Sequence, residues 1–239
     1  MEFFDLLKDA CEKENLAFNK ETYNKFIVYK ELIKEWNQKI NLTAITDDEE
    51  IIKKHFIDSI KIFEFPYVKE AKTIIDIGTG GGFPGIPMKI VNSDSKMVLL
   101  DSLNKRINFL NLVINEINLS NIETIHGRAE DFARNDIYRE KFDLAVSRAV
   151  ANTTVLLELC LPYVKAGGYF VALKGPAIED EIKEANNALK VLGGKIEEII
   201  EVDIAGSNLK HNLLVVKKIM NTPNKYPRKA GMITKNPIK

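Results

Sequence analysis

The sequence predicts an α/β fold in which helices cover a mostly parallel, seven-stranded sheet that ends in an antiparallel hairpin. From residue 73 onward, short runs rich in β-branched residues alternate with amphipathic helical stretches. A glycine-rich segment follows the first of these runs, and two strand-like runs close the series with no helix between them. Strand–helix alternation is typical of parallel sheets with helices on both faces.

Length and composition permit a sizeable core, because the chain has 239 residues and 45% of them are apolar. The formal net charge is zero, so contact with nucleic acid must depend on a local patch. Cys11 and Cys160 occur in half-apolar, helical contexts, which predicts buried thiols and no disulfide framework. The acidic start and the lack of a long apolar run predict a cytoplasmic protein with no membrane partner.

Residues 1–66 are predicted to form a small helical N-terminal region. Apolar and aromatic residues recur at helical spacing over Tyr23–Trp36 and again over Ile52–Phe63. We expect these stripes to be packing faces. The polar segment Asn37–Ala44 between them is predicted to be non-helical.

Residues 67–220 are predicted to form the main domain, and residues 221–239 a basic, extended tail. The expected parallel strands are Thr73–Ile77, Lys96–Asp101, Ile122–His126, Phe142–Ser147 and Gly168–Leu173. The expected helices of this domain are Gly85–Val91, Lys105–Ile117, Thr153–Leu161 and Ile178–Leu192.

The last two strand-like runs, Lys195–Ile204 and Leu209–Ile219, are joined by only a short segment at Ala205–Asn208. They must pair antiparallel, because a parallel return needs about a dozen residues or more. A dinucleotide-binding sheet has no such hairpin in its ordinary form, whereas methyltransferases that use S-adenosylmethionine (SAM) typically do. The pattern therefore favours a Rossmann-like, SAM-dependent methyltransferase fold.

The glycine-rich segment after the first strand contains Gly78, Gly80 and Gly82 and is preceded by Asp76. Glycine permits positive φ and lets the backbone approach a ligand closely. In an open α/β sheet this turn lies at the carboxyl edge, where ligands bind. We therefore expect Asp76 and the three glycines to bind the cofactor.

The sequence of this turn is compatible with two classes of cofactor, a dinucleotide and SAM. The spacing Gly80-x-Gly82-x-x-Gly85 matches the dinucleotide fingerprint, which leaves an NAD(P)-dependent oxidoreductase as an alternative. However, Pro84 falls inside the fingerprint, and a carboxylate at Asp76 would repel a pyrophosphate. SAM carries a cationic amine and a sulfonium instead of phosphates, so the acid favours SAM.

Further candidate residues follow the later strands. Asp101 ends the second strand, where a carboxylate can accept both ribose hydroxyls of an adenosine. Glu130 follows the third strand, near the expected adenine, although it could equally begin a short helix. Ser147–Ala149 follows the fourth strand and lacks the Asn/Asp-Pro-Pro-aromatic run of enzymes that methylate exocyclic amines. Cys160 lies too deep in a helix to serve as a nucleophile.

The end of the chain is basic and contains no acidic residue after residue 217. A cationic, extended tail suits contact with phosphate, and Tyr226 could stack on a base. The alternative is a solvated tail. The three histidines His55, His126 and His211 lack metal-ligand spacing, so we expect structural roles and no metal site. The predicted RNA-binding residues are Lys225, Arg228, Lys229 and Lys235.

Several motifs together resemble the bacterial 16S ribosomal RNA guanine-N7 methyltransferases of the G type, also called the glucose-inhibited division protein B family. The combination spans nearly the whole chain, although the glycine turn alone is not specific. The matching segments are Trp36–Thr43, His55-x-x-Asp58-Ser59, Asp76–Pro87, Gly127–Glu130, Ser147–Ala149 and Tyr226–Gly231.

The resemblance implies a SAM-dependent transfer to N7 of one guanosine near the decoding region, with 16S ribosomal RNA or the small ribosomal subunit as partner. It implies cofactor contacts at Gly78, Phe83, Ala129 with Glu130, and Arg148. Guanine N7 has a lone pair and no proton. Arg148 is therefore expected to position a reactant, and no general base is expected. A non-catalytic RNA-binding protein with this fold remains an alternative.

Overall fold

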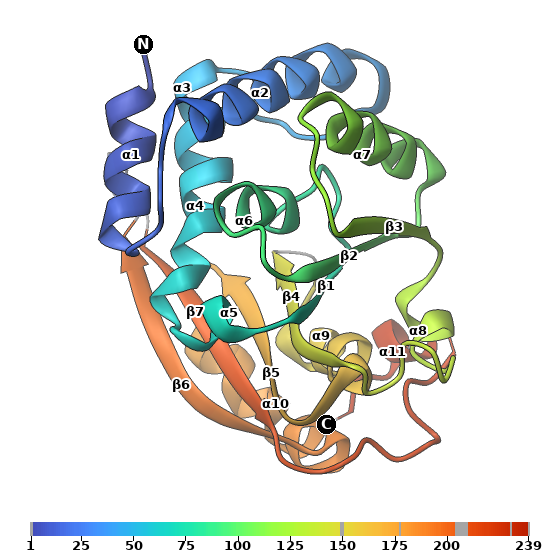
Figure 1. Ribbon diagram of the computed structural model, residues 1–239. Helices are drawn as coiled ribbons and strands as arrows, with labels where there is room; N and C mark the ends of the chain where they lie inside the picture. The colour runs from blue at the N-terminus through green and yellow to red at the C-terminus, as the bar shows by residue number, and fades with distance from the viewer. Residues whose placement is uncertain (1, 149–150, 177, 204–209, 230, 239) are drawn as a thin grey trace.

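The computed structural model describes residues 2–148, 151–176, 178–203, 210–229 and 231–238. Within these residues one sheet has the strand order β3-β2-β1-β4-β5-β7-β6, with β1 to β5 parallel and β7 antiparallel to both of its neighbours (Figure 1). The predicted fold class and hairpin are confirmed. The strands are β1 Thr73–Ile77, β2 Lys96–Asp101, β3 Ile122–His126, β4 Phe142–Arg148, β5 Val164–Lys174, β6 Gly194–Asp203 and β7 Lys210–Lys218.

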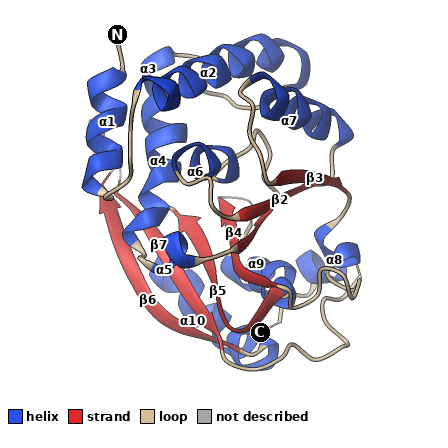
Figure 2. Cartoon of the chain, in the orientation of Figure 1, coloured by secondary structure: helices blue, strands red, loops and turns tan. Residues whose placement is uncertain are grey.

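Helices cover both faces of the sheet (Figure 2). One face carries α1 Phe4–Lys13, α2 Lys20–Ile40, a helical segment at 48–64, α5 Tyr67–Glu70, α6 Gly85–Val91 and α7 Asn104–Glu116. The other face carries α8 Ala129–Phe132, α9 Thr153–Cys160, the 3₁₀ turn η3 Leu161–Tyr163 and α10 Ile178–Leu192. The short α11 Met232–Lys235 lies near the end of the chain.

Alternate residues of the central strands enter different cores, as a strand period of two requires. Ile74 and Val146 belong to the core beneath the N-terminal helices, α6 and α7, whereas Ile75 and Ala145 belong to the core beneath α9 and α10. The N-terminal stripes pack directly into the first core, and Phe26 and Phe56 are fully buried there. The helical region therefore shares its core with the sheet.

The second N-terminal stripe lies on one continuous helical segment that changes its winding. It comprises α3 Asp48–Ile51, the π-helical turn η1 Ile52–Ile57, α4 Asp58–Ile60 and the 3₁₀ turn η2 Lys61–Glu64. π-helical turns are rare, and those that do occur are often found at functional sites. This one contains His55 and is followed directly by Asp58, and both side chains are buried.

Two local predictions differ clearly from the structure. Asn37–Ile40 was expected to be non-helical, but α2 continues to Ile40 because Ile40, one turn beyond Trp36, still packs against the core. The helix ends where Asn41 adopts a left-handed conformation with φ of 48°. Strand β5 starts at Val164, four residues before the expected Gly168, and its pairing with β4 contains a register shift. The hairpin connection 205–208 lies outside the described residues.

Candidate functional site

A cavity of about 560 Å³ lies at the carboxyl edge of the sheet, around the ends of β1, β2, β3 and β4. Its volume falls in the range of small-molecule sites, about 300–1,000 Å³. The switch point between β1 and β4, where the strand order reverses, opens into it. The predicted cofactor-binding residues that line it are Gly78, Gly80, Phe83, Asp101, Ala129, Glu130 and Arg148.

The glycine turn is shaped by left-handed backbone and by hydrogen bonds to β2. Gly78 and Gly80 have φ of 70° and 60°, which side chains disfavour. The Gly78 N–H donates to the Leu100 carbonyl over 2.9 Å, and the Gly80 N–H donates to Asp101 Oδ2 over 2.9 Å. A Cβ at Gly80 would have only the Gly78 carbonyl oxygen nearby, at 3.9 Å. Gly80 therefore leaves open space at the wall of the cavity.

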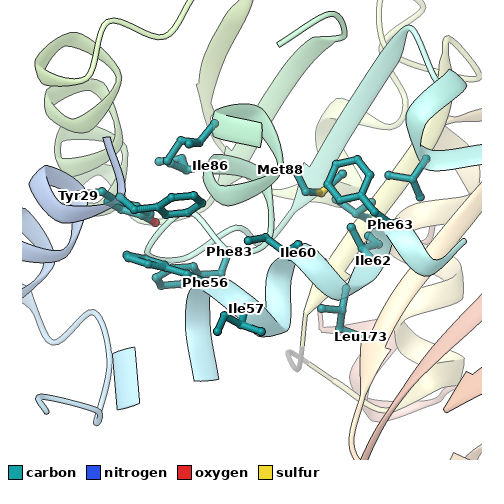
Figure 3. Close-up of a cluster of buried hydrophobic side chains, with 14 of the residues drawn as sticks. Tyr29, Phe56, Ile57, Ile60, Ile62, Phe63, Phe83, Ile86, Met88 and Leu173 are labelled. Atoms are coloured by element: carbon teal, nitrogen blue, oxygen red, sulfur yellow. The ribbon is translucent and has the colours of Figure 1, made fainter. Parts of the chain in front are cut away.

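Gly82 is required for a different reason, because it does not line the cavity. A Cβ there would lie 2.6 Å from Ile86 Cδ1 and 2.7 Å from the Tyr29 hydroxyl oxygen. The Tyr29 hydroxyl donates a hydrogen bond to the Gly81 carbonyl, and the Tyr29 and Phe56 rings pack beside Phe83 (Figure 3). The missing side chain at Gly82 thus lets the N-terminal region support the turn.

Asp76 lies beneath the turn and does not line the cavity, although it was predicted to bind the cofactor. Its Oδ2 accepts hydrogen bonds from Thr79 Oγ1 over 2.7 Å and from the Gly85 N–H over 2.9 Å. Complete burial raises the pKa of Asp76 to about 7. Its observed role is to tie the two ends of the turn together.

Asp101 lines the cavity and is already tied to the turn. Besides the Gly80 N–H, it accepts the Leu103 N–H at Oδ1 over 2.9 Å and lies 3.3 Å from the Arg106 guanidinium. Only 2% of the residue is exposed. The carboxylate is therefore fixed at the end of β2, at the position expected for a ribose contact.

Arg148 lines the cavity and is the last residue of β4, where a loop position was expected. Its guanidinium carbon lies 4.5 Å from the centre of the Phe83 ring. One terminal nitrogen donates to the Lys54 carbonyl over 3.1 Å and to Asp58 Oδ2 over 3.2 Å. The other lies 3.1 Å from His55 Nδ1. The predicted positioning residue is thus itself held firmly by the N-terminal region.

His55 connects three parts of the site, a role that the sequence analysis missed. Its ring stacks on Phe83 with centroids 4.5 Å apart, and its Nε2 lies 2.7 Å from Thr43 Oγ1. Burial, followed by the neighbouring positive charge of Arg148, lowers the pKa of His55 to about 4, so the ring is neutral at physiological pH. The signal in the sequence was the His55-x-x-Asp58 spacing, which places both side chains on one helical face.

The predicted RNA-binding residues of the tail fall into two groups. Arg228 donates to Glu158 of α9 from its backbone N–H and its guanidinium, over 2.6–3.2 Å, and Glu158 is fully buried. Arg228 is thus engaged inside the molecule. Lys225, Lys229 and Lys235 are exposed.

The tail is also less extended than expected. Arg139 donates to the carbonyls of Thr222 and Tyr226, and Arg134 donates to the Pro227 carbonyl. The short helix α11 contributes the buried Ile233. The tail therefore packs on the body of the protein.

The described part of the chain shows no candidate for a metal site, a membrane-spanning helix or an exposed thiol. Its His, Cys, Asp and Glu side chains include no group of three or more that could hold a metal ion. None of its helices combines the length and apolar character that membrane crossing requires. Both cysteines are buried, and burial raises the pKa of the Cys11 thiol to about 12 and that of Cys160 well above its usual value.

Comparison with known proteins identifies the family. The family model for rRNA small subunit methyltransferase G (GidB) matches residues 22–217. The chain belongs to the rRNA small subunit methyltransferase G family. It is 64% identical over 236 residues to the ribosomal RNA small subunit methyltransferase G of Clostridium novyi, covering 99% of this chain and 97% of that protein. It is 60% identical to the enzyme of the same name from Clostridium botulinum (strain 657), over the full length of both.

Solved structures support the methyltransferase fold at low sequence identity. A SAM-dependent methyltransferase from Aquifex aeolicus aligns with a TM-score of 0.53 and 19% identity, over 71% of this chain and 94% of that one. TYW2 from M. jannaschii, solved in complex with AdoMet, aligns with a TM-score of 0.51 and 16% identity, over 66% and 76% of the two chains. Family membership makes the chain a SAM-dependent methyltransferase and decides against the oxidoreductase alternative.

Proposed function

We propose that this protein transfers the methyl group of SAM to N7 of one guanosine near the decoding region of 16S ribosomal RNA. The observation that carries the proposal is the cavity at the switch point, in a chain of the rRNA small subunit methyltransferase G family. The substrate is 16S ribosomal RNA or the small ribosomal subunit that contains it, and the reaction takes place in the cytoplasm.

The cavity suits SAM in both shape and chemistry. Gly78 and Gly80 leave room for the methionine part, Asp101 accepts from the ribose, and Ala129 with Glu130 meets the adenine. Arg148 and Phe83 form the wall nearest β4. Asp76 and Gly82 act indirectly, because they shape the turn and do not line the cavity. When bound, SAM supplies a methyl group on a cationic sulfur, so the chain itself need only orient and enclose the reactants.

The proposed reaction requires no general base. The N7 lone pair of guanine can attack directly, because it carries no proton. His55, the histidine beside the cavity wall, directs Nδ1 toward the Arg148 guanidinium, so that nitrogen is not open to a substrate proton. The single-turnover rate is therefore expected to vary little between about pH 6.5 and 8.5. A tenfold rise per pH unit would reveal a base.

The cofactor site can be tested with two glycine variants that share the same backbone strain. Gly80→Val should abolish SAM binding in calorimetry, since the new side chain enters the cavity wall. Gly167→Val is the matched control, because Gly167 also has positive φ (87°) and open space but lies at the start of β5, away from the cavity. Normal affinity in Gly80→Val, or equal loss in both variants, would contradict the site assignment.

The methylated atom can be identified chemically. Labelled SAM is incubated with unmodified 16S RNA and, separately, with small subunits that lack the modification. N7-methylguanosine carries a fixed positive charge, so borohydride reduction followed by aniline should cleave the RNA at the labelled nucleotide. Labelled RNA that resists cleavage would exclude N7 as the target. RNA binding without labelling of either substrate would support the non-catalytic alternative.

A further inference from the structure

Arg148 is held at the cavity wall by side chains from the N-terminal region. We propose that His55 and Asp58 are positioning residues that fix the Arg148 guanidinium against the Phe83 ring before the cofactor arrives. Their contacts with Arg148, at 3.1 and 3.2 Å, both come from the helical segment 48–64. The proposal deepens the proposed function, on which it rests, because Arg148 is taken as a cofactor contact there.

The contacts of His55 allow two neutral tautomers, and the proposal requires one of them. Nδ1 lies 3.1 Å from an Arg148 guanidinium nitrogen and 3.2 Å from the Lys54 carbonyl oxygen. The carbonyl oxygen can only accept and the guanidinium can only donate, so a hydrogen bond from Arg148 to His55 requires an unprotonated Nδ1. The neutral ring must then carry its proton on Nε2, which donates to Thr43 Oγ1 over 2.7 Å. Thr43 Oγ1 also accepts from the Ile45 N–H, which fixes the loop that places Leu42 on the cavity wall. In this tautomer His55 aligns both Arg148 and this loop, whereas the Nδ1–H tautomer would donate to the Lys54 carbonyl instead.

Asp58 is prevented from turning away from Arg148 by a second partner. Its Oδ1 accepts from His211 Nδ1 of β7 over 2.7 Å, while its Oδ2 accepts from Arg148. The Asp58 side chain is only 3% exposed, so competition from water is weak. The carboxylate thus joins β4, β7 and the N-terminal segment at one point.

These contacts would raise affinity by preorganisation. A free arginine has many rotamers, and a ligand that orders it must offset that loss of entropy. Here the stacking on Phe83 and the contacts with His55, Asp58 and the Lys54 carbonyl are already made in the folded protein. The entropy of the Arg148 side chain is therefore lost during folding, and SAM binding does not have to offset it.

A double-mutant cycle on SAM affinity tests whether His55 acts through Arg148. His55→Phe keeps a ring for stacking on Phe83 but removes the Nδ1 acceptor. We expect His55→Phe and Arg148→Gln each to raise the Kd for SAM about tenfold or more. The double variant should bind no more than about twofold more weakly than Arg148→Gln alone, because the two residues act as one unit. If the Kd increases of the two single variants multiplied in the double variant, the proposal would be overturned.

Two further measurements separate positioning from a merely structural role. His55→Asn, which restores an acceptor close to the Nδ1 position, should recover much of the affinity that His55→Phe removes, with urea midpoints recorded for all variants. Nitrogen-15 spectra of the wild-type protein should show His55, identified by nuclear Overhauser contacts between its ring and the Phe83 ring, as the neutral Nε2–H tautomer. An Nδ1–H tautomer would overturn the proposal even if no variant folds.

A failure of the proposed function can be distinguished from a failure of the positioning roles of His55 and Asp58. The cycle measures SAM binding without RNA, so a failure to methylate RNA would contradict the proposed substrate and leave the positioning roles standing. Wild-type protein that bound no SAM would contradict the cofactor assignment, while the tautomer measurement would still decide whether His55 accepts from Arg148.

Discussion

The two segments that flank the sheet domain are attached to it in contrasting ways. The N-terminal region enters the site itself, since Leu42 lines the cavity and His55 and Asp58 hold Arg148. The basic tail packs on the other side and reaches the cavity only indirectly. Its Arg228 pairs with Glu158 on α9, the helix whose Leu156 and Leu159 line the cavity.

The contrast shows that charge in a sequence does not by itself reveal which segment forms a site. The tail is conspicuous because it is basic, yet Arg228 neutralises a buried acid of the same chain. The N-terminal region looks like packing helices, yet it supplies the polar groups that orient a cavity arginine. A long cation near a buried carboxylate pairs internally, because an unpaired buried charge is costly.

The largest expected effect concerns the tail as a structural element. Arg228→Met leaves Glu158 buried and unpaired, so we expect a loss of about 3–5 kcal/mol in the free energy of unfolding. Urea denaturation should show a lower midpoint at unchanged slope. Lys229→Met, at an exposed neighbour, is the control and should stay within about 0.5 kcal/mol of wild type. Equal midpoints for both variants would contradict the structural role of Arg228.

A second prediction concerns the exposed cations of the tail. Replacing Lys225, Lys229 and Lys235 by Gln should flatten the log–log salt dependence of RNA affinity by about 0.7–0.9 for each phosphate that a lysine had neutralised, or about 2–3 in total. Stability and SAM affinity should not change. Filter binding over a range of KCl concentrations measures the slope. An unchanged slope would mean that the tail is a solvated end that does not touch RNA.

The smallest effect tests the contribution of the N-terminal region to the site. Thr43→Val removes the acceptor for the His55 Nε2–H, a loss of about 1 kcal/mol for one hydrogen bond, or roughly fivefold in Kd. We expect calorimetry to show a weakening of SAM binding of at most this size, and the free energy of unfolding to fall by no more than about 1 kcal/mol. Thr22→Val, at a hydroxyl far from the cavity, is the control. Unchanged SAM affinity in Thr43→Val would show that the loop does not depend on His55.

Local sequence determined most of the fold and the position of the turn. The strand-like runs at 73–77, 96–101 and 122–126 match β1 to β3 residue for residue, because short apolar or β-branched runs bounded by turn residues leave few other solutions. The short connection forced the antiparallel pairing of β6 and β7. Family motifs identified the chain as a methyltransferase before any side chain was placed.

The tertiary structure alone decided which polar groups meet. Asp76 and Asp101 lie on the same face of the sheet, yet Asp76 lies beneath the turn and Asp101 lines the cavity. Asp76 is in register with Leu99, so Asp101 lies two residues closer to the carboxyl edge. Arg148 meets Asp58 and His55 from 90 and 93 residues further along the chain, and no local pattern can predict such contacts. Sequence spacing specifies the elements and their faces, whereas the partners of a buried charge depend on how those faces pack together.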